Sequence, residues 1–425
     1  MSLIILFALL FVLLIAGAPV AVALGVSSLA FIMINGLPNV IVLHNMVNGI
    51  NSFPLIAVPF FIMAGHLMNS AGITERIFTF ARATVGWMYG GLGHVNVGAS
   101  VIFAGMSGAA VADAGGLGNI EIKAMRKAGY DTDFSVGVTA ASSTIGPIIP
   151  PSLPLVVYGV IADTSIGQLF AAGLIPGLIM AMSLMIMVAV YAKLRDYPRD
   201  DKFRFGVFFA SLRDAMLPLF TPIIIVGGIL AGIFTPTEAA IAAVAYATFL
   251  GLFVYRTLDA KRLLRVSMDT VETTASIMLI VAASAMFAWI LTANEVAQMF
   301  AEHLLAFVDG KIAILLIIML IVLLVGCFME TLAAITILTP VLLPVAVSVG
   351  VDPVHFGIIL ILNLMIGLLT PPVGLVLYVL SKVSDVPFER CVTATAPFLV
   401  PLVLVLLALT FIPELSMWLP TAIYR

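Results

Sequence analysis

The stretch TIGPIIPPSLPLVVYG, residues 144–159, decides the fold of this chain. It places four prolines within eight residues of an otherwise apolar segment: Pro147, Pro150, Pro151 and Pro154. Proline lacks an amide N–H and its ring clashes with the carbonyl four residues earlier, so no regular helix can pass through this stretch. A closely similar stretch, MIGLLTPPVGLVLYV, occupies residues 365–379. The sequence therefore predicts two broken helices at related positions.

The composition is that of a membrane protein. Hydrophobic residues make up 62% of the 425 residues, charged residues only 10%, and the mean hydropathy is +1.22. Apolar runs recur at the length of about 20 residues that a helix needs to cross about 30 Å of hydrocarbon. This pattern excludes a soluble globular protein and predicts an all-α polytopic membrane protein in contact with lipid. We expect no nucleic-acid partner, and the net charge of −3 says little because most of the surface faces the membrane.

The two proline-rich stretches belong to a longer internal repeat. Four residues recur 221 positions later: Gly105 as Gly326, Gly146 as Gly367, Pro150 as Pro371 and Pro151 as Pro372. Each half reads as several full spans, then a glycine-rich segment, then a broken span. We therefore predict two repeats, each with a re-entrant helical hairpin and a broken transmembrane helix. The first covers residues 1–200, with the hairpin at 97–125 and the broken helix at 134–161; the second covers 201–425, with the hairpin at 326–345 and the broken helix at 355–381.

The distribution of basic residues predicts the orientation. Residues 191–213 hold six of the 19 basic residues and residues 256–265 hold four. These two segments flank two apolar spans, so they lie on one side of the membrane, and the positive-inside rule makes that side cytoplasmic. The nearly uncharged termini are then expected on the periplasmic side. Two halves that start on opposite sides are inverted, an arrangement typical of secondary transporters with sites at the bilayer midplane.

The prolines also predict where an ion could bind. Within a helix they would free the carbonyls of Ser143, Gly146 and Pro147 in the first copy, and of Gly367 and Leu368 in the second. Free carbonyls inside a membrane survive only where they line a cavity or bind something. Together with the hydroxyls of Ser143, Thr144 and Thr370 they suit Na⁺. A kink that is satisfied locally is the alternative for one segment, but two matched copies favour an ion.

An acidic residue lies in the first glycine-rich segment, GMSGAAVADAGGLGN (residues 105–119). Asp113 is a functional candidate because burying an acid at membrane depth is costly unless it is paired. The alternative is that Asp113 is the N-cap of the second hairpin arm. Ser107 precedes it across the expected turn, and Glu330 and Thr331 occupy a comparable place in the second half.

Other polar groups have structural explanations. In FTPTEAA (residues 234–240), Thr235, Pro236 and Glu238 match the first positions of a capping box. Cys327 and Cys391 sit in apolar surroundings and are expected to pack as small hydrophobic residues. The five histidines show no metal-ligand spacing, and neither an HExxH motif nor the Gly-x-Gly-Asp signature of intramembrane aspartyl proteases occurs. We therefore expect no enzyme, no cofactor and no metal site other than Na⁺.

Three features occur together in this chain: the twin Gly-x-x-x-Pro-Pro segments, the MSGAAVADAGGLG hairpin (residues 106–118) and GIFTPTEAA (residues 232–240). Together they resemble the large membrane subunit of a TRAP transporter, a tripartite ATP-independent periplasmic transporter. The likeness covers essentially the whole chain. It implies a bacterial inner-membrane importer that is coupled to Na⁺ and moves its transport domain by an elevator mechanism. It also implies two partners, a small four-helix membrane subunit and a periplasmic substrate-binding protein.

The residue pattern and this resemblance together predict two Na⁺ sites. The first would comprise Ser107, Asp113, Ser143, Thr144, Gly146 and Pro147. The second, its symmetry mate, would comprise Gly326, Thr331, Gly367, Leu368 and Thr370. Family members often have serine at the position of Ala109, so a side-chain ligand is excluded there.

The substrate implied by the resemblance is a small carboxylate, of the sialic acid or C4-dicarboxylate class. The helix N-termini at the breaks would favour such an anion. No residue of this chain selects between these acids, so the substrate-binding residues stay open. A stand-alone symporter for Na⁺ and divalent anions, of related elevator architecture, is the alternative function, and a channel is a weaker one.

Overall fold

The computed structural model describes residues 2–198, 203–307 and 310–424, apart from the side chains of residues 105–107, 301 and 303–307. Within these ranges the chain is built of helices and turns and contains no strand. The helices of the first half are α1 (Ser2–Ile15), α2 (Val20–Ile34), α3 (Val40–Ile50), η1 (Phe53–Ile56), α4 (Ala57–Ser70), α5 (Ile73–Val85), α6 (Gly91–Ser107), α7 (Ala110–Gly115), α8 (Leu117–Lys127), α9 (Thr132–Ser143), α10 (Leu153–Ile161) and α11 (Ile166–Arg195).

The described part of the second half is also built of helices and turns. Its helices are α12 (Phe205–Pro222), η2 (Ile223–Gly227), α13 (Gly228–Leu230), α14 (Pro236–Phe249), η3 (Leu250–Val254), α15 (Ala260–Ala293), α16 (Val296–Phe307), α17 (Lys311–Gly326), α18 (Thr331–Ser348), α19 (Pro353–Gly367), α20 (Leu375–Ser384), α21 (Phe388–Phe411) and α22 (Glu414–Ile423).

Helix boundaries repeat with the sequence offset. Helix α7 begins at Ala110 and α18 at Thr331, while α9 begins at Thr132 and α19 at Pro353; both pairs are 221 residues apart. In each half the chain reverses between two helices, at 108–109 and at 327–330, and then runs into a helix interrupted at the proline pair. The first arm of the second hairpin begins at Lys311, so the segment predicted as 326–345 holds the turn and most of the second arm. Both proline pairs, Pro150–Pro151 and Pro371–Pro372, have cis peptide bonds.

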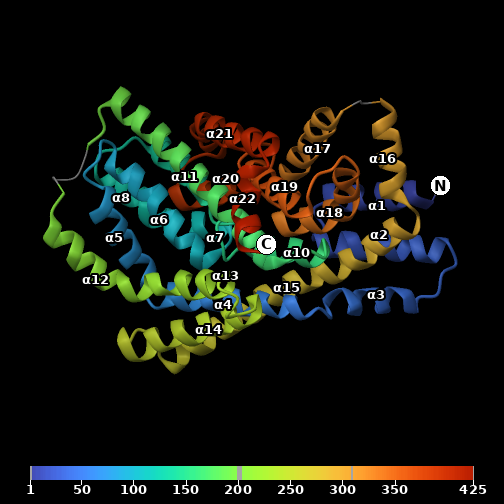
Figure 1. Ribbon diagram of the computed structural model, residues 1–425, viewed down its shortest axis with the longest axis horizontal. Helices are drawn as coiled ribbons and strands as arrows, with labels where there is room; N and C mark the ends of the chain where they lie inside the picture. The colour runs from blue at the N-terminus through green and yellow to red at the C-terminus, as the bar shows by residue number, and fades with distance from the viewer. Residues whose placement is uncertain (1, 199–202, 308–309, 425) are drawn as a thin grey trace.

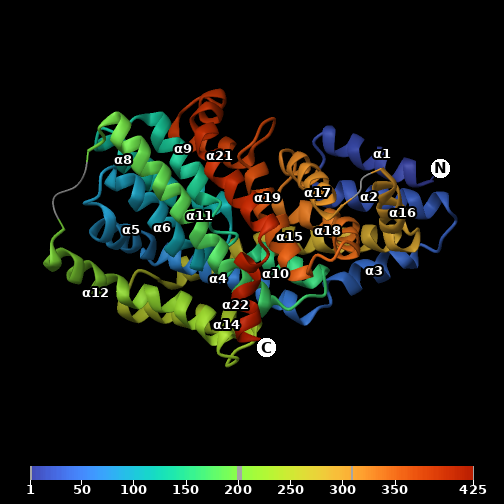
Figure 2. The ribbon, with the colours of Figure 1, turned by 45° about the horizontal axis from the view of Figure 1, so that its top comes forward.

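The broken helices lie at the centre of the molecule. In Figures 1 and 2, helices α10 and α19 occupy the middle, with α5, α6 and α8 gathered at one end and α1 to α3 and α16 to α18 at the other. The two halves exchange equivalent contacts: α7 packs on α20 as α18 packs on α10, and α21 packs on α9 as α11 packs on α19. The Tyr158 hydroxyl on α10 donates to the Pro353 carbonyl at the start of α19, 2.6 Å away. Each broken helix is therefore held by elements of the opposite half.

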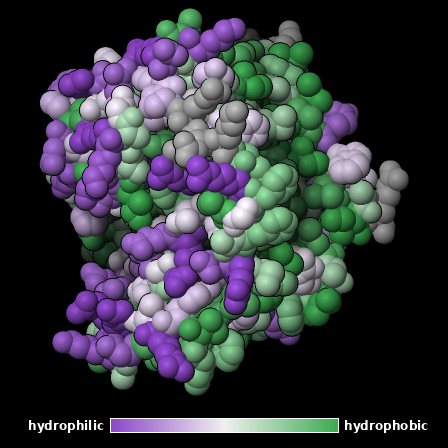
Figure 3. Space-filling view, turned by 90° about the vertical axis from the view of Figure 1, so that its left-hand side faces the viewer, coloured by the Kyte–Doolittle hydropathy of each residue, from purple (hydrophilic) through white to green (hydrophobic). Residues whose placement is uncertain are grey.

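The surface fits a lipid environment. Seven of the described helices are long and apolar enough to cross a membrane, and many large apolar side chains on them are exposed, such as Ile186, Phe209 and Leu404. Such extensive exposed apolar surface marks a membrane contact. Figure 3 shows hydrophilic residues gathered on one side of one end of the molecule, with hydrophobic residues on the other side. The predicted all-helical membrane fold is confirmed.

Several smaller predictions are also confirmed. The Thr235 hydroxyl accepts from the Glu238 N–H while the Glu238 carboxylate accepts from the Thr235 N–H, which is the expected capping box at the start of α14. Cys327 and Cys391 are both free and buried.

Candidate functional site

The break in the first broken helix is a compact turn, and a side chain within it donates a hydrogen bond to one of the carbonyls that the break exposes. Residues 144–152 separate α9 from α10, and the whole stretch is buried. Ser152 is the N-cap of α10; its hydroxyl accepts from the Leu155 N–H and donates to the Pro147 carbonyl. One of the carbonyls predicted to be free thus has a partner. A carbonyl oxygen has two lone pairs, so one remains available to a cation.

The two hydroxyls before the break are turned toward the helix. Ser143 Oγ donates to the Ala140 carbonyl at 2.8 Å, and Thr144 Oγ1 donates to the Ala141 carbonyl at 2.6 Å. Both residues are at most 1% exposed. Because the hydroxyl protons are used inside the helix, the oxygen lone pairs stay free to coordinate a cation.

The turn of the first hairpin rests on this break. Gly108 has a φ of +59°, and a Cβ there would lie 2.8 Å from the Pro151 carbonyl oxygen. Gly146, within the break, faces the Ala109 amide nitrogen. The predicted residues Gly146 and Pro147 therefore lie against the hairpin turn, next to the end of α6 at Ser107. The Ser107 side chain lies outside the described residues, so its predicted role stays a prediction.

The second half makes the equivalent contact through backbone alone. A Cβ on Gly367 would lie 2.6 Å from the Gly326 carbonyl carbon, so two predicted residues touch with no room for a side chain. The Cys327 carbonyl, in the hairpin turn, accepts from the N–H groups of Val373 and Gly374 at 3.3 and 3.4 Å. The second hairpin is thus bonded directly to the second break.

The remaining predicted residues of the second site have local partners. The Gly367 carbonyl accepts from the Thr370 N–H at 2.9 Å, and the Leu368 carbonyl accepts from the Val376 N–H at 3.3 Å. Thr370 Oγ1 donates to the Ile366 carbonyl at 2.8 Å. The chain turns tightly on both sides of the proline pair, which brings N–H groups back to carbonyls that a helix would leave bare. As in the first break, each oxygen keeps a lone pair.

The two hairpin tips and both breaks converge on one small cavity. It has a volume of about 60 Å³ and is lined by Ala109 to Val111, Pro147, Leu153, Pro154, Glu330 to Leu332 and Leu368. Pro147, Thr331 and Leu368 come from the two predicted sites, which therefore meet here. Glu330 is the N-cap of α18, with one carboxylate oxygen accepting from the N–H groups of Leu332 and Ala333 at 2.8 and 3.2 Å.

Asp113 lies in α7, the short helix that follows the turn of the first hairpin, and its predicted membership of the first Na⁺ site stays a prediction. It is not a helix cap, because the N-cap positions of α7 and α8 are Ala109 and Gly116. Its side chain is 2% exposed, and neither carboxylate oxygen has a hydrogen-bond partner. Its polar neighbours are Ser100 on α6 and the carboxylate of Glu121 on α8.

Sequence reasoning missed the polar residues that surround Asp113. Four buried residues form a connected network on three helices: Asn96 on α6, Glu121 on α8, and Thr139 and Ser142 on α9. The rule that an acid at membrane depth signals function was applied to Asp113 and would equally have identified Glu121.

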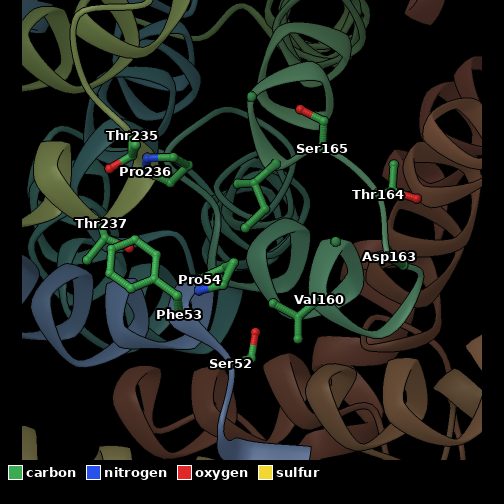
Figure 4. Close-up of a pocket in the computed structure, with 13 residues that line it drawn as sticks. Ser52, Phe53, Pro54, Val160, Asp163, Thr164, Ser165, Thr235, Pro236 and Thr237 are labelled. Carbon is green, nitrogen blue, oxygen red and sulfur yellow. The ribbon is translucent and has the colours of Figure 1, made fainter.

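A second cavity, of about 490 Å³, opens where three helices begin. It is lined by residues 52–54 of the loop and η1, by residues 159–167 around the α10–α11 turn except 161 and 162, and by Thr235 to Thr237 at the start of α14. Figure 4 shows these three segments around a common space. Helix N-termini carry partial positive charge, so this cavity is a favourable environment for an anion. Ser165 and Thr235 already cap α11 and α14.

Comparison with known proteins agrees with this arrangement. The family model for "Tripartite ATP-independent periplasmic transporter, DctM component" matches residues 7–415. The sialic acid TRAP transporter large permease protein SiaM of Vibrio cholerae is 50% identical over 96% of both chains. The C4-dicarboxylate large permease DctM of Pseudomonas aeruginosa is 38% identical over 87% of this chain and 86% of its own length.

One further relative is a longer protein, and one solved structure shares the fold. The sialic acid permease SiaT of Haemophilus influenzae is 42% identical over 89% of this chain, which matches 61% of that longer protein. The YdaH transporter of Alcanivorax borkumensis, whose crystal structure shows an unusual topology, aligns with a TM-score of 0.63 at 14% identity, over 89% of this chain and 88% of its own. The relatives are permeases rather than enzymes. The chain therefore belongs to the DctM family of TRAP transporter large permeases and is a multi-pass inner-membrane protein.

Proposed function

We propose that this chain is the transmembrane subunit of a Na⁺-coupled secondary transporter that imports an organic acid delivered by a periplasmic binding protein. The observation that carries the proposal is the convergence of two hairpin tips and two broken helices on one cavity, in a chain of the DctM family. Broken helices that meet at a shared site are the usual basis of ion and substrate binding in secondary transporters. A small four-helix membrane subunit is the second partner.

Sialic acid is the first candidate substrate. SiaM and SiaT, the relatives named for sialic acid, are 50% and 42% identical to this chain, whereas the C4-dicarboxylate relatives are 38% and 35% identical. A C4-dicarboxylate is the second candidate. Both acids carry a carboxylate, which the helix N-termini at the breaks and around the larger cavity would favour.

The chemistry of the breaks supports Na⁺ as the coupling ion. Oxygen atoms of hydroxyl and carbonyl groups are the ligands that hard cations prefer. The first break supplies them in buried positions, and the second supplies carbonyls of the buried Gly367 and Leu368 with the hydroxyl of the half-buried Thr370. Glu330 is the charged residue among those that line the small cavity, and its negative charge favours a cation there. No cofactor is needed for this chemistry, because the Na⁺ gradient supplies the free energy of transport.

An elevator mechanism is part of this proposal, and the packing of the helices supports it. The hairpins pack on the broken helices, through α6 and α7 on α9 and α18 on α10 and α19, so these elements could move together as one transport domain; α6 and α18 also contact α4 and α15. Helices α1 to α4, α14 and α15 pack with one another and would form the static scaffold. The larger cavity lies between these two groups, because its lining comes from η1 and α14 on one side and the α10–α11 turn on the other.

Reconstitution tests this proposal. Liposomes containing this chain and the small subunit, with the binding protein outside, should accumulate radiolabelled sialic acid when Na⁺ is high outside. Uptake should be negligible when K⁺ replaces Na⁺, when the binding protein is left out, or when the chain is reconstituted without the small subunit. Replacing sialic acid by succinate, each with its cognate binding protein, decides between the two substrate classes.

Two results would redirect the proposal. Strong Na⁺-driven uptake of free substrate by this chain alone would favour the stand-alone symporter. Equal uptake with K⁺ and Na⁺ gradients would remove Na⁺ coupling while leaving the tripartite assembly intact.

A further inference from the structure

The segment that joins η3 to α15, residues 255–265, is unusually rich in positive charge, and we call it the basic turn. Five of its eleven residues are charged, although charged residues make up only 10% of the whole chain. Four of the five are basic, and all four are exposed: Arg256, Lys261, Arg262 and Arg265. The turn therefore presents a concentrated positive charge on the surface.

The charges of the basic turn are not neutralised by neighbouring acids. The one acid within it, Asp259, is the N-cap of α15, and its Oδ1 accepts from the Arg262 N–H at 2.7 Å. The Arg262 guanidinium donates to the Thr257 carbonyl. Among the described residues, none of the four basic side chains forms an ion pair, although Asp269 and Glu272 follow on the next turns of α15.

Arginines on the hairpin and broken-helix elements are used differently. Arg195 pairs with Asp131 at 2.8 Å, and Arg390 pairs with Asp133 at 2.6 Å. Arg126 on α8 donates to the last carbonyl of α20 at 2.8 Å. These cations join one element of the fold to another. The basic turn makes no such ionic link, so its charges are available to a partner outside the chain.

Arg256 occupies a position where its backbone conformation favours glycine. Its φ is +52°, in the left-handed region, directly after the end of η3. The N–H groups of Thr257 and Leu258 both reach back to the Gly251 carbonyl, at 3.0 and 3.1 Å, and this reversal requires the left-handed residue. Glycine adopts that conformation without strain, whereas an arginine does not. Because the Arg256 side chain is exposed and packs on nothing, its charge is the property that distinguishes it from glycine here.

Apolar stripes lead away from the basic turn along both flanking helices. Phe249 and Phe253, on α14 and η3, are 52% and 66% exposed, and their ring centroids lie 5.5 Å apart. Leu264, Met268 and Val271 on α15 are 61–66% exposed. Residues three and four apart share one face of a helix, so each set forms a continuous stripe. Helices α14 and α15 both pack on α4 rather than on each other, which leaves the two stripes uncovered by this chain.

We propose that the basic turn binds the phosphate headgroup of an anionic phospholipid, whose acyl chains lie along the two apolar stripes. Guanidinium and ammonium groups bind phosphate oxygens, and arginine does so with two parallel hydrogen bonds. Basic residues next to a membrane span attract anionic lipids. A zwitterionic phospholipid brings its own cation, which the unpaired basic residues would repel. A free anion could use the charges but not the stripes.

This inference goes beyond the proposed function and does not depend on the coupling ion or the substrate. The basic turn connects α14 to α15, and both helices belong to the group assigned to the static scaffold. A bound lipid would hold this end of the scaffold at the level of the headgroups. The scaffold would then keep its depth in the membrane while the hairpins and broken helices move.

Native mass spectrometry of the detergent-purified protein, mixed with equal amounts of phosphatidylglycerol and phosphatidylcholine, tests the inference. The wild type should retain phosphatidylglycerol in preference. Arg256→Gly, Lys261→Gln and Arg265→Gln should each weaken phosphatidylglycerol binding about fivefold, and the triple variant about a hundredfold. Arg262 is kept because it donates within the turn. Lys123→Gln, the same change at an exposed position on α8, is the matched control and should bind as the wild type does.

Thermal unfolding separates loss of the lipid from loss of the fold. Arg256→Gly places glycine in the conformation that glycine favours, so its Tm without added lipid should equal or exceed that of the wild type. The rise in Tm produced by phosphatidylglycerol should nevertheless be smaller in this variant. In Lys123→Gln the rise should match that of the wild type.

Four results would overturn the inference. The first is equal retention of phosphatidylglycerol by the triple variant and by Lys123→Gln. The second is equal binding of the two lipids by the wild type, because the stripes alone would then explain binding. The third is release of phosphatidylglycerol by millimolar inorganic phosphate, which would identify a site for a free anion. The fourth is loss of the small subunit from the triple variant with lipid binding unchanged, which would assign the basic turn to subunit docking.

Discussion

At the scale of single residues, Gly367 and Gly326 contact each other through their backbones, and this contact leaves no room for a side chain at position 367. A Cβ on Gly367 would lie 2.6 Å from the Gly326 carbonyl carbon, and backbone atoms cannot move aside as a side chain can. Gly367→Ala should therefore push the second hairpin off its break, at a cost of about 1–3 kcal/mol. The thermal unfolding midpoint of the detergent-purified protein should fall accordingly, and uptake should fall with it.

Gly25→Ala is the matched control for that substitution. A Cβ on Gly25, within α2, meets nothing within 4 Å, and alanine is favoured over glycine in a helix by about 1 kcal/mol. Gly25→Ala should therefore leave the midpoint equal to or above that of the wild type. Equal midpoints for the two variants would show that the Gly326–Gly367 contact is not tight.

The second prediction at this scale concerns the charge of Asp113. Asp113→Asn keeps the shape of the side chain but removes the charge that would offset a buried Na⁺. We expect uptake to fall strongly and its dependence on Na⁺ concentration to shift, while the protein still inserts and purifies as a folded species. Asp269→Asn, at an exposed position on α15 away from both cavities, should transport normally. Unchanged Na⁺ dependence in Asp113→Asn would remove this residue from ion coupling.

At the scale of elements, the start of α9 is tied to the end of α11. Asp131, the N-cap residue of α9, accepts from the Tyr197 hydroxyl at 2.7 Å and from Arg195 at 2.8 Å. The Tyr197 hydroxyl first, and the Arg195 guanidinium second, hold the pKa of Asp131 below its ordinary value of 3.8. Burial raises the pKa of Tyr197 to about 12, so its hydroxyl remains a donor throughout the neutral range.

These pKa shifts give a stability prediction with a definite sign. A carboxyl whose pKa is lower in the folded state stabilises that state above its ordinary pKa and loses this contribution as the pH falls through the lowered value. Tyr197→Phe should therefore destabilise the protein at pH 7, by about 1 kcal/mol or less because the Asp131 side chain that accepts from it is 55% exposed. The loss should shrink toward pH 3, as chemical denaturation at both pH values would reveal. A loss that is the same at both pH values would mean that the Tyr197 hydroxyl does not stabilise the fold through the charge of Asp131.

Particular residues explain what could be predicted at this scale. Proline pairs and the Thr235 to Glu238 capping box act through neighbouring backbone, so their effects can be predicted from a few consecutive residues. The bond between Asn96 and Thr139 spans 43 residues, and its existence depends on how α6 packs against α9. Each of these residues alone reads as an ordinary polar residue in an apolar helix. The breaks and hairpin segments were therefore predictable, whereas the buried cluster required the packed structure.

At the scale of the whole molecule, the large cavity and the basic segments lie at opposite ends of α11 and α14. The C-terminal helix α22 packs on α11, and Tyr424 lies beside Gly167 near the start of α11. Gly167 and the start of α14 line the same large cavity, whereas the basic residues near 195 and 261 lie beyond the far ends of α11 and α14. If the basic ends are cytoplasmic, the C-terminus and the large cavity face the periplasm. The cavity would then be placed to receive substrate from a binding protein.

Cysteine labelling tests this orientation directly. In a background without Cys327 and Cys391, single cysteines replace Lys261 and Thr421, both of which are exposed in the structure. A membrane-impermeant maleimide added to spheroplasts should label Thr421→Cys at once and Lys261→Cys only after the membrane is permeabilised, because the positive-inside rule keeps the basic segment in the cytoplasm. The reverse pattern would invert the molecule and place the large cavity on the cytoplasmic side. Immediate labelling of both would mean that the two positions lie on the same side of the membrane. That result would contradict the assignment of the start of α14 and the basic residues beyond its end to opposite sides.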